Sequence, residues 1–269
     1  MYISLGLPLT FKHRDPRRIA LKLSYDGTGY HGWQKQPKLE KTIQGTLERE
    51  LSAFLKESIT VDGASRTDAG VHAEDQLAAF TTTHPVRLAG LIKAMNKKLP
   101  EQIAVNQAYE VDLGFVPRFV NEGKRYRYRI YYANSRHPML DRFATWIHYP
   151  LNTEAMMHGL AHLHGEHDFQ SFAASNGQHQ TSIRALWLTS LTCKKLNSDV
   201  IMYEIHFAGS GFLKQMVRNL VGTLLEIGRG HWEADCIPEI ISAKARSAAG
   251  PTAPARGLCL EEMFWTPPK

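Results

Sequence analysis

The same order of strands and helices is predicted twice along this chain, and that repeat limits its possible folds more than any other feature. In the first half, apolar residues occupy every second position from Ile19 to Tyr25, which is typical of a half-buried strand. Apolar spacing also predicts helices over 43–55 and 88–99 and strands over 59–64, 76–82 and 103–111. The predicted order is therefore β-α-β-β-α-β.

The second half repeats this order, beginning with a strand around residues 126–130. It continues with a helix over 154–163, strands over 183–191 and 201–207, a helix over 212–227 and a strand over 258–264. We expect Gly228 to follow the last long helix as its C′ residue. Two such units in tandem predict an α+β fold with two antiparallel sheets and helices on one face of each.

No linker of low complexity separates the two halves. We expect the first at residues 17–113, carrying the loop around Asp68, and the second at 114–269, carrying the strand around Tyr126 and the helix around Arg218. The halves are expected to form one rigid body with a central cleft. If their edge strands pair into a continuous sheet, its other face stays free for a ligand.

A loop of small residues from Ala64 to Ala73 carries the strongest candidate for chemistry, Asp68. Arg66 lies two residues before it and His72 four residues after it. A guanidinium close to a carboxylate favours its charged form, which is the form needed by a nucleophile or a general base. The alternative is an Asx turn in which Asp68 only pairs with its neighbour.

Aromatic and basic residues alternate in the sequence Tyr126-Arg127-Tyr128-Arg129, so the rings lie on one face of a strand. Exposed tyrosine rings on a sheet are stacking platforms for unpaired bases. The alternative is that both rings pack in the core while the arginines are solvated. The sequence does not decide which face is buried.

Two further groups of residues have a structural and a functional interpretation. His158 and His162 have the spacing of helical metal ligands, but no His-Glu-x-x-His pattern or nearby Cys supports a metal site, so surface histidines are favoured. Arg218 lies outside the apolar stripe of its helix, on the side of Lys214. It is therefore either solvated or directed toward a phosphate backbone.

The segment from Tyr25 to Gln34 is rich in glycine but lacks the Gly-Lys-Ser/Thr ending of a phosphate-binding loop. Its glycine spacing suits a tight turn that presents Trp33 and Gln34, so we expect a structural role.

The formal net charge of +6 favours a polyanionic partner. Three widely spaced cysteines suggest neither a disulfide framework nor a zinc ribbon. No apolar run approaches the roughly 20 residues that span a bilayer, and the first ten residues lack the basic region of a secretory signal. We therefore expect a cytoplasmic protein without a membrane partner.

Several of these segments, in this order, closely resemble the TruA family of tRNA pseudouridine synthases. The matching motifs are Tyr25-Asp26-Gly27, Gly32-Trp33-Gln34-Lys35-Gln36, Thr42-Ile43-Gln44, Arg66-Thr67-Asp68-Ala69-Gly70-Val71-His72-Ala73, Lys124-Arg125-Tyr126-Arg127-Tyr128, His167-Asp168-Phe169, Met216-Val217-Arg218-Asn219 and Gly257-Leu258. Together they span the chain from Arg18 to Trp265.

The resemblance implies two ferredoxin-like halves that share a sheet, a homodimer, and neither a metal nor an organic cofactor. It implies an isomerase that converts uridine to pseudouridine in the anticodon stem-loop of tRNA, at tRNA positions 38, 39 and 40. The basic surface would hold the RNA through its shape and phosphates. Candidate contributors to that surface are Lys35, Lys38, Lys41, Lys93, Lys97 and Lys98.

The same resemblance implies a role for each candidate site residue. Asp68 would be the catalytic carboxylate and would attack the uridine at C6 or C1′, after which the base rotates and rejoins through C5. Tyr126 would stack on the flipped uracil and assist in proton handling. Arg66 would occupy the gap left in the RNA, Arg218 would pair with Asp68, and Leu258 would form an apolar wall.

The chain departs from the family pattern at a few positions. Ser65 stands where bacterial members usually have Gly, Phe115-Val116-Pro117-Arg118 lacks the usual Ala before Arg, and Cys259 replaces a common aromatic residue. We could assign no family counterpart to residues 1–15.

Two other functions remain open from the residues alone. A non-catalytic RNA-binding protein or RNA chaperone would bind tRNA and leave its uridines unchanged. A hydrolase of nucleosides or glycosides would need a second acid near Asp68, such as Glu74 or Asp75.

Overall fold

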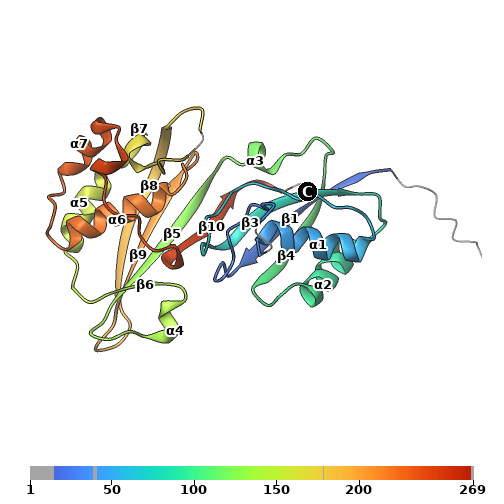
Figure 1. Cartoon of the computed structure of the whole chain (residues 1–269), viewed down its shortest axis with the longest axis horizontal. Helices are drawn as coiled ribbons and strands as arrows, with labels where there is room; N and C mark the ends of the chain where they lie inside the picture. Colours follow the sequence, from blue (N-terminus) through green and yellow to red (C-terminus); the bar gives the residue numbers. More distant parts are fainter. Residues whose placement is uncertain (1–14, 39–40, 178, 268–269) are drawn as a thin grey trace, which may run out of the picture.

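The computed structural model describes residues 15–38, 41–177 and 179–267, and the first ten residues discussed above lie outside these ranges. Ten strands form one sheet, which runs through the molecule from end to end (Figure 1). The strands are β1 (Arg17–Tyr25), β2 (Asp62–Gly63), β3 (His72–Thr82), β4 (Ile103–Val111), β5 (Gly123–Tyr132), β6 (Thr145–Ile147), β7 (Gly165–Asp168), β8 (Ile183–Lys195), β9 (Ile201–Gly209) and β10 (Leu258–Phe264).

The longer helices pack against this sheet in two groups, which Figure 1 places at opposite ends of the molecule. The α-helices are α1 (Ile43–Leu55), α2 (Leu88–Lys98), α3 (Pro117–Val120), α4 (Pro138–Asp141), α5 (Thr153–Ala161), α6 (Met216–Gly228) and α7 (Cys236–Ala243). Short 3-10 helices are η1 (Phe169–Phe172), η2 (Arg246–Ala248) and η3 (Ala255–Gly257).

The strand order is β4-β1-β3-β10-β5-β9-β8-β7, with β2 beside β3 and β6 beside β5. Neighbours along the main path are antiparallel except at one junction, where β3 and β10 pair in parallel through Cys259 with His72 and Leu260 with Ala73. This junction joins the two predicted units into a continuous sheet. The prediction of an α+β fold with two antiparallel units is confirmed.

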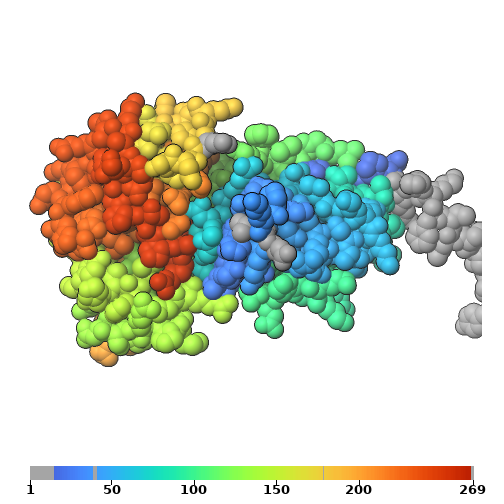
Figure 2. All heavy atoms as spheres, viewed as in Figure 1, coloured from blue at the N-terminus to red at the C-terminus, as the bar shows by residue number. Residues whose placement is uncertain are grey.

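The main hydrophobic core extends through both groups of helices, and a smaller cluster around Tyr131 is separate from it. On β1, the alternating residues Ile19, Leu21 and Leu23 are fully buried together with Leu47 of α1. On the other side of the junction, Leu220 of α6 belongs to the same core. The blue and cyan residues of the first unit and the red residues of the second also touch in the space-filling view (Figure 2). Continuous packing across the junction fixes the residues that line it.

The sequence prediction was wrong at the start and the end of the helix expected over 212–227. Helix α6 begins only at Met216, because Gln215 adopts a left-handed conformation with φ of 60°. Gly228 is still helical, and the glycine with positive φ after the helix is Gly230. Residues 212–215 therefore form an irregular segment in front of α6.

A smaller difference concerns the strand that precedes the Asp68 loop. The strand expected over 59–64 is reduced to the two residues of β2, because only Asp62 and Gly63 pair with β3. The cysteines at 193, 236 and 259 are free. Among the described residues, no helix has the length and apolar character needed to cross a membrane.

Candidate active site

A cavity of about 730 Å³ lies beside the junction of the two units. Asp68, Arg66, Tyr126 and Leu258 all line it, so the structure brings together four of the five predicted site residues. The fifth, Arg218, reaches Asp68 from the first turn of α6. The irregular segment 212–215 that precedes α6 forms part of the same wall.

Asp68 forms an ion pair with Arg218, whose Nη1 lies 3.4 Å from the carboxylate Oδ2. The Asp68 side chain is 22% exposed and that of Arg218 is 15% exposed. The Nε of Arg218 donates to the carbonyl of Ala253 at 2.7 Å, which fixes the direction of the guanidinium. The interpretation of Arg218 as a solvated residue is therefore wrong, and its pairing with Asp68 agrees with the expectation from the family resemblance.

Arg66 lies on the same loop but has a different position. Its side chain is exposed, and among the described residues the ion-pair partner of Asp68 is Arg218 rather than Arg66. An exposed cation at the edge of the cavity is available to a ligand that enters it. The local pairing of Asp68 with Arg66, which the sequence offered as an alternative, is not formed.

The two tyrosines of β5 have different environments although they share one face. Tyr128 is fully buried, and its hydroxyl bonds to Thr145 and to the carbonyl of Pro254. Tyr126 lines the cavity, with its ring edge-to-face against Phe212 at 5.1 Å between centroids. Burial raises the pKa of Tyr126 to about 12. Tyr128 is therefore a core residue, and Tyr126 is the ring available to a ligand.

The loop just before Asp68 is held by buried hydrogen bonds of Ser65 and Thr67. Gln76 accepts from the backbone N–H of Ser65 at 3.1 Å and donates to the Ser65 carbonyl at 2.7 Å. The hydroxyls of Tyr25 and Thr67 lie 2.8 Å apart. A carboxylate on a loop fixed in this way loses little conformational entropy when a substrate binds.

The glycine-rich segment supports this loop, as expected from its structural interpretation. The backbone N–H of Trp33 donates to the Thr67 carbonyl at 3.0 Å, and Gly70 donates to the carbonyl of Tyr30 at 3.2 Å. Gly32 has φ of 85°, and a Cβ added to it would lie 2.6 Å from the Thr67 carbonyl oxygen. Only glycine allows this close approach to the Asp68 loop.

Substitution of Gly32 is therefore expected to destabilise the protein. In Gly32→Ala, positive φ alone costs about 1–2 kcal/mol, and the contact with Thr67 adds to it, so the unfolding free energy should fall by at least ~2 kcal/mol. Gly90→Ala is the control, because an added Cβ there meets nothing within 4 Å. It should raise helix stability by ~0.5–1 kcal/mol. Equal urea midpoints for the two variants would contradict this account of the loop.

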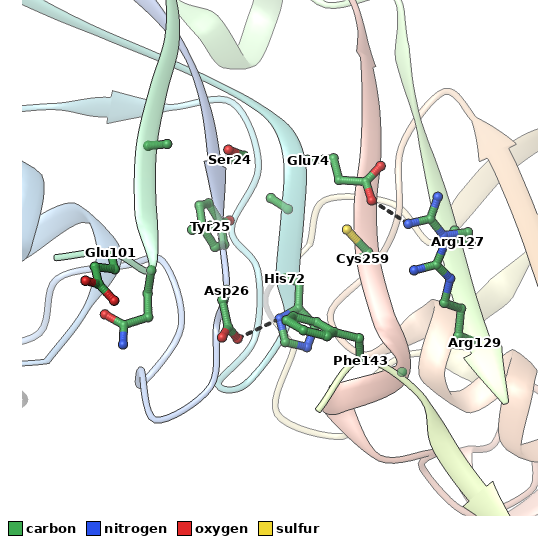
Figure 3. Close-up of a pocket in the computed structure, with 14 residues that line it drawn as sticks. Ser24, Tyr25, Asp26, His72, Glu74, Glu101, Arg127, Arg129, Phe143 and Cys259 are labelled. Atoms are coloured by element: carbon green, nitrogen blue, oxygen red, sulfur yellow. Dashed lines mark hydrogen bonds and ion pairs between the residues drawn. The ribbon is translucent and has the colours of Figure 1, made fainter. Parts of the chain in front are cut away.

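The opposite face of the sheet has a smaller cavity of about 290 Å³, lined by charged residues (Figure 3). Arg127 and Arg129 face it from β5, and Glu74 of β3 forms an ion pair with Arg127. Arg127 also pairs with Glu261. The arginines that alternate with the tyrosines are therefore paired with carboxylates, and are not simply solvated.

Ion pairs of this kind also argue against Glu74 or Asp75 as the second catalytic acid that a hydrolase would need. Glu74 bonds Arg127, and Asp75 forms an ion pair with Lys22 at 2.9 Å. Neither of the two carboxylates lines the cavity that holds Asp68. A mechanism with a second carboxylate from this segment is therefore not supported.

His72 of the Asp68 motif also faces this smaller cavity (Figure 3). Its Nδ1 lies 3.1 Å from both the Gly27 N–H and the Asp26 carboxylate, and its Nε2 lies 3.2 Å from the carbonyl of Arg256. Burial lowers the pKa of His72, although the Asp26 charge opposes this shift. The ring links three segments of backbone and is not part of the cavity around Asp68.

The lowered pKa of His72 predicts a dependence of stability on pH. The unfolded protein binds a proton at this residue more readily than the folded one, so stability is complete above the ordinary His pKa of about 6.5 and decreases as pH falls below it. His72→Gln should remove this contribution. The urea midpoint of the wild type should therefore fall more between pH 7.5 and 5.5 than that of the variant. Parallel changes in the two proteins would contradict the prediction.

Of the histidine pair that the sequence offered as a weak metal site, His158 lies in α5 and His162 is the C-cap of that helix. Nε2 of His158 and of His162 are 3.5 and 3.1 Å from the same oxygen of Asp235, just before α7. None of these three residues lines the cavity around Asp68. The carboxylate gives both rings a polar partner and connects α5 with α7.

The sequence assigned no role to two polar residues of the cavity wall, Ser65 and Lys124. The Ser65 hydroxyl lies 3.0 Å from that of Tyr126 and accepts from Lys124 Nζ at 3.3 Å. Burial lowers the pKa of Lys124 to about 8, and the charges of Arg118 and Arg184 act in the same direction. In the sequence, Ser65 is a departure from the family pattern, and Lys124 begins a family motif two residues before Tyr126, on the same face of β5.

The chain is similar in sequence to proteins of one family. The chain matches the family described as tRNA pseudouridine synthase over residues 22–119 and 160–265. It is 41% identical over 249 residues to tRNA pseudouridine synthase A of Acetivibrio thermocellus, which covers 93% of this chain and 100% of that protein. The protein of the same name from Myxococcus xanthus is 41% identical over 92% of both chains.

Likeness to solved structures is much weaker. The archaeal box H/ACA sRNP Nop10-Cbf5 complex matches with a TM-score of 0.33 and 8% identity, covering 86% of this chain and 60% of that one. The match to the sequence family covers both units of the sheet and includes Asp68, Arg218 and Leu258. The chain therefore belongs to the tRNA pseudouridine synthase family, whose members are isomerases.

Proposed function

We propose that the cavity around Asp68 converts uridine to pseudouridine in the anticodon stem-loop of tRNA. The observation that carries this proposal is the Asp68 carboxylate, fixed by Arg218 inside a cavity that also presents the Tyr126 ring. Its volume lies within the range of about 300–1,000 Å³ that is typical of small-molecule sites. An isomerisation needs no redox group, so one positioned nucleophile is sufficient.

Each of the other residues has a role consistent with its position. The target base must leave the RNA stack, at a cost of a few kcal/mol, before it reaches Asp68. The Tyr126 ring is available to stack on the flipped base, and Leu258 supplies an apolar wall. Arg66 is exposed at the edge of the cavity, where its side chain can fill the gap left in the RNA.

The charge around the cavity suits a polyanion. Four cationic residues line it, namely Arg66, Arg118, Lys124 and Lys214. Two carboxylates, Asp62 and Asp68, are among the lining residues, and Asp62 is paired with Arg18. Positive charge is therefore in excess, and tRNA binding should weaken steeply with salt.

The experiment that tests this function is direct. Purified protein is incubated with unmodified tRNA, and pseudouridine is mapped along the product. We expect it at positions 38, 39 and 40, and at no uridine outside the anticodon stem-loop. Product elsewhere in the tRNA would contradict the proposed substrate site, and tight, salt-sensitive binding without any product would favour an RNA-binding protein without catalytic activity.

We also propose that the protein is a homodimer without a metal or organic cofactor, as the family resemblance implies, and that it acts in the cytoplasm. Sedimentation should give twice the chain mass of 30.4 kDa.

A further inference from the structure

Three polar side chains on one wall of the cavity are connected by hydrogen bonds. The hydroxyls of Tyr126 and Ser65 lie 3.0 Å apart, and Nζ of Lys124 lies 3.3 Å from the Ser65 oxygen. Lys124 also lies 3.4 Å from the carbonyl oxygen of Ala64. A serine hydroxyl donates one hydrogen bond and accepts others. Ser65 therefore links the phenol to the amine.

The surroundings of Lys124 favour its neutral form. The charged groups that face it are Arg118 from α3 and Arg184 from β8, and both are cationic. The other ionisable residues that line the cavity are His31, Asp62, Arg66, Asp68, Tyr126 and Lys214. Among the described residues, no carboxylate forms an ion pair with Lys124. Burial is the main cause that lowers the Lys124 pKa to about 8, so a substantial fraction is neutral amine at mildly alkaline pH.

We propose that Lys124 accepts, through the hydroxyl of Ser65, the proton that Tyr126 removes from C5 of the uracil. The proposal rests on the proposed function of the cavity, and it assigns Lys124 as the final base of that reaction. A base with a pKa near the working pH is the most effective proton acceptor. A buried phenol alone is poorly suited to this task, because it has no group to which its own proton can pass.

The proton transfer balances as follows, once Asp68 is free again and the uracil has rejoined the ribose through C5. The C5–H bond breaks, and its electron pair forms the C5=C6 double bond while the C6=N1 pair moves to N1. The C5 proton goes to the Tyr126 oxygen, the phenol proton goes to Ser65, and the Ser65 proton goes to neutral Lys124. Water supplies a proton to N1, and Lys124 later returns one to water, so the isomerisation is neutral overall.

Ser65 gives this chain a feature that a glycine at the same position would lack. The backbone of Ser65 is held by Gln76 on both its N–H and its carbonyl, so the loop does not depend on the hydroxyl. Ser65→Ala therefore removes the link between Tyr126 and Lys124 while the supports of the Asp68 loop remain. Ser65→Thr keeps a hydroxyl and is the conservative variant.

The test measures single-turnover pseudouridine formation with tRNA that carries hydrogen or deuterium at C5 of uridine, from pH 6.5 to 9. In the wild type, the rate should increase with pH and level off above about 8, as Lys124 loses its proton. Ser65→Ala and Lys124→Met should each slow the reaction by ~10–100-fold. In both variants, the rate should no longer increase with pH near 8. Both should also show a larger C5 deuterium isotope effect, because removal of the C5 proton becomes the slow step. Ser65→Thr should retain most of the rate.

Lys214→Met is the matched control, because it removes a positive charge from the same cavity without touching Ser65. It should weaken tRNA binding and leave the isotope effect unchanged. The proton relay is the path from Tyr126 through Ser65 to Lys124. If Lys124→Met behaves in the same way as Lys214→Met, or if Ser65→Ala and Lys124→Met both keep the wild-type rate and pH profile, the relay is overturned while the proposed function stands. If the wild type forms no pseudouridine, the proposed function fails and the relay fails with it.

Discussion

Asp68→Asn should abolish pseudouridine formation, with a fall in single-turnover rate of at least ~10⁴-fold. The amide has nearly the shape of the carboxylate, but it is not a nucleophile at neutral pH, and it removes the negative charge that Arg218 faces at 3.4 Å. The loop is held by Gln76 and by the Tyr25–Thr67 contact, and these hydrogen bonds do not involve the Asp68 side chain. Binding of tRNA should therefore change by less than about threefold.

Asp199→Asn is a suitable control for this experiment. Asp199 is exposed on the turn between β8 and β9, and the same change of charge there should leave both rate and affinity unaltered. An Asp68→Asn protein that retains a tenth or more of the wild-type rate would exclude Asp68 as the nucleophile. Mass spectrometry should confirm that the asparagine has not deamidated to aspartate.

Substitution of Tyr126 should produce the second large effect, and two variants separate its two contributions. Tyr126→Phe keeps the ring against Phe212 and loses the hydroxyl, so we expect a loss of ~10²-fold in rate from proton handling. Tyr126→Ala also loses base stacking, which is worth ~1–3 kcal/mol and adds a further ~5–150-fold. Rates in single turnover and dissociation constants for tRNA are the quantities to compare.

Affinity for tRNA should change much less than the rate in both Tyr126 variants, because a flipped base contributes only one of many contacts to the RNA. Equal losses in rate and in affinity would show that Tyr126 contributes to tRNA binding and not to the chemical step. Unfolding curves should accompany these measurements, since the side chain is 6% exposed and its truncation leaves a cavity.

Much of the fold follows from local patterns in the sequence. Strand β10 spans the same residues as the strand expected over 258–264, and the alternating apolar residues from Ile19 to Tyr25 lie in β1, because alternation on a half-buried strand is a strong signal. The predicted start of α6 was wrong because the apolar spacing already begins at Phe212. The left-handed conformation of Gln215, which delays the helix, cannot be recognised from its residue type. The parallel pairing of β3 with β10 joins segments far apart in the chain, so local patterns contain no information about it.

Only part of the candidate site could be predicted from the sequence. Asp68 could be identified from its small-residue loop, but its partner Arg218 is 150 residues away and looked solvated because it lies outside the apolar stripe of its helix. Family resemblance, rather than spacing, paired the two residues. Ser65 and Lys124 received no role because their contact depends on the register between the Asp68 loop and β5, which only the folded chain establishes.

The measurement that tests the central claim most directly is the balance of products in a single turnover with unmodified tRNA. For each uridine lost, the wild type should form one pseudouridine and release no free uracil, while Asp68→Asn should consume no uridine. Release of free uracil would indicate a hydrolase, and equal pseudouridine formation by the two proteins would show that the chemistry does not depend on Asp68.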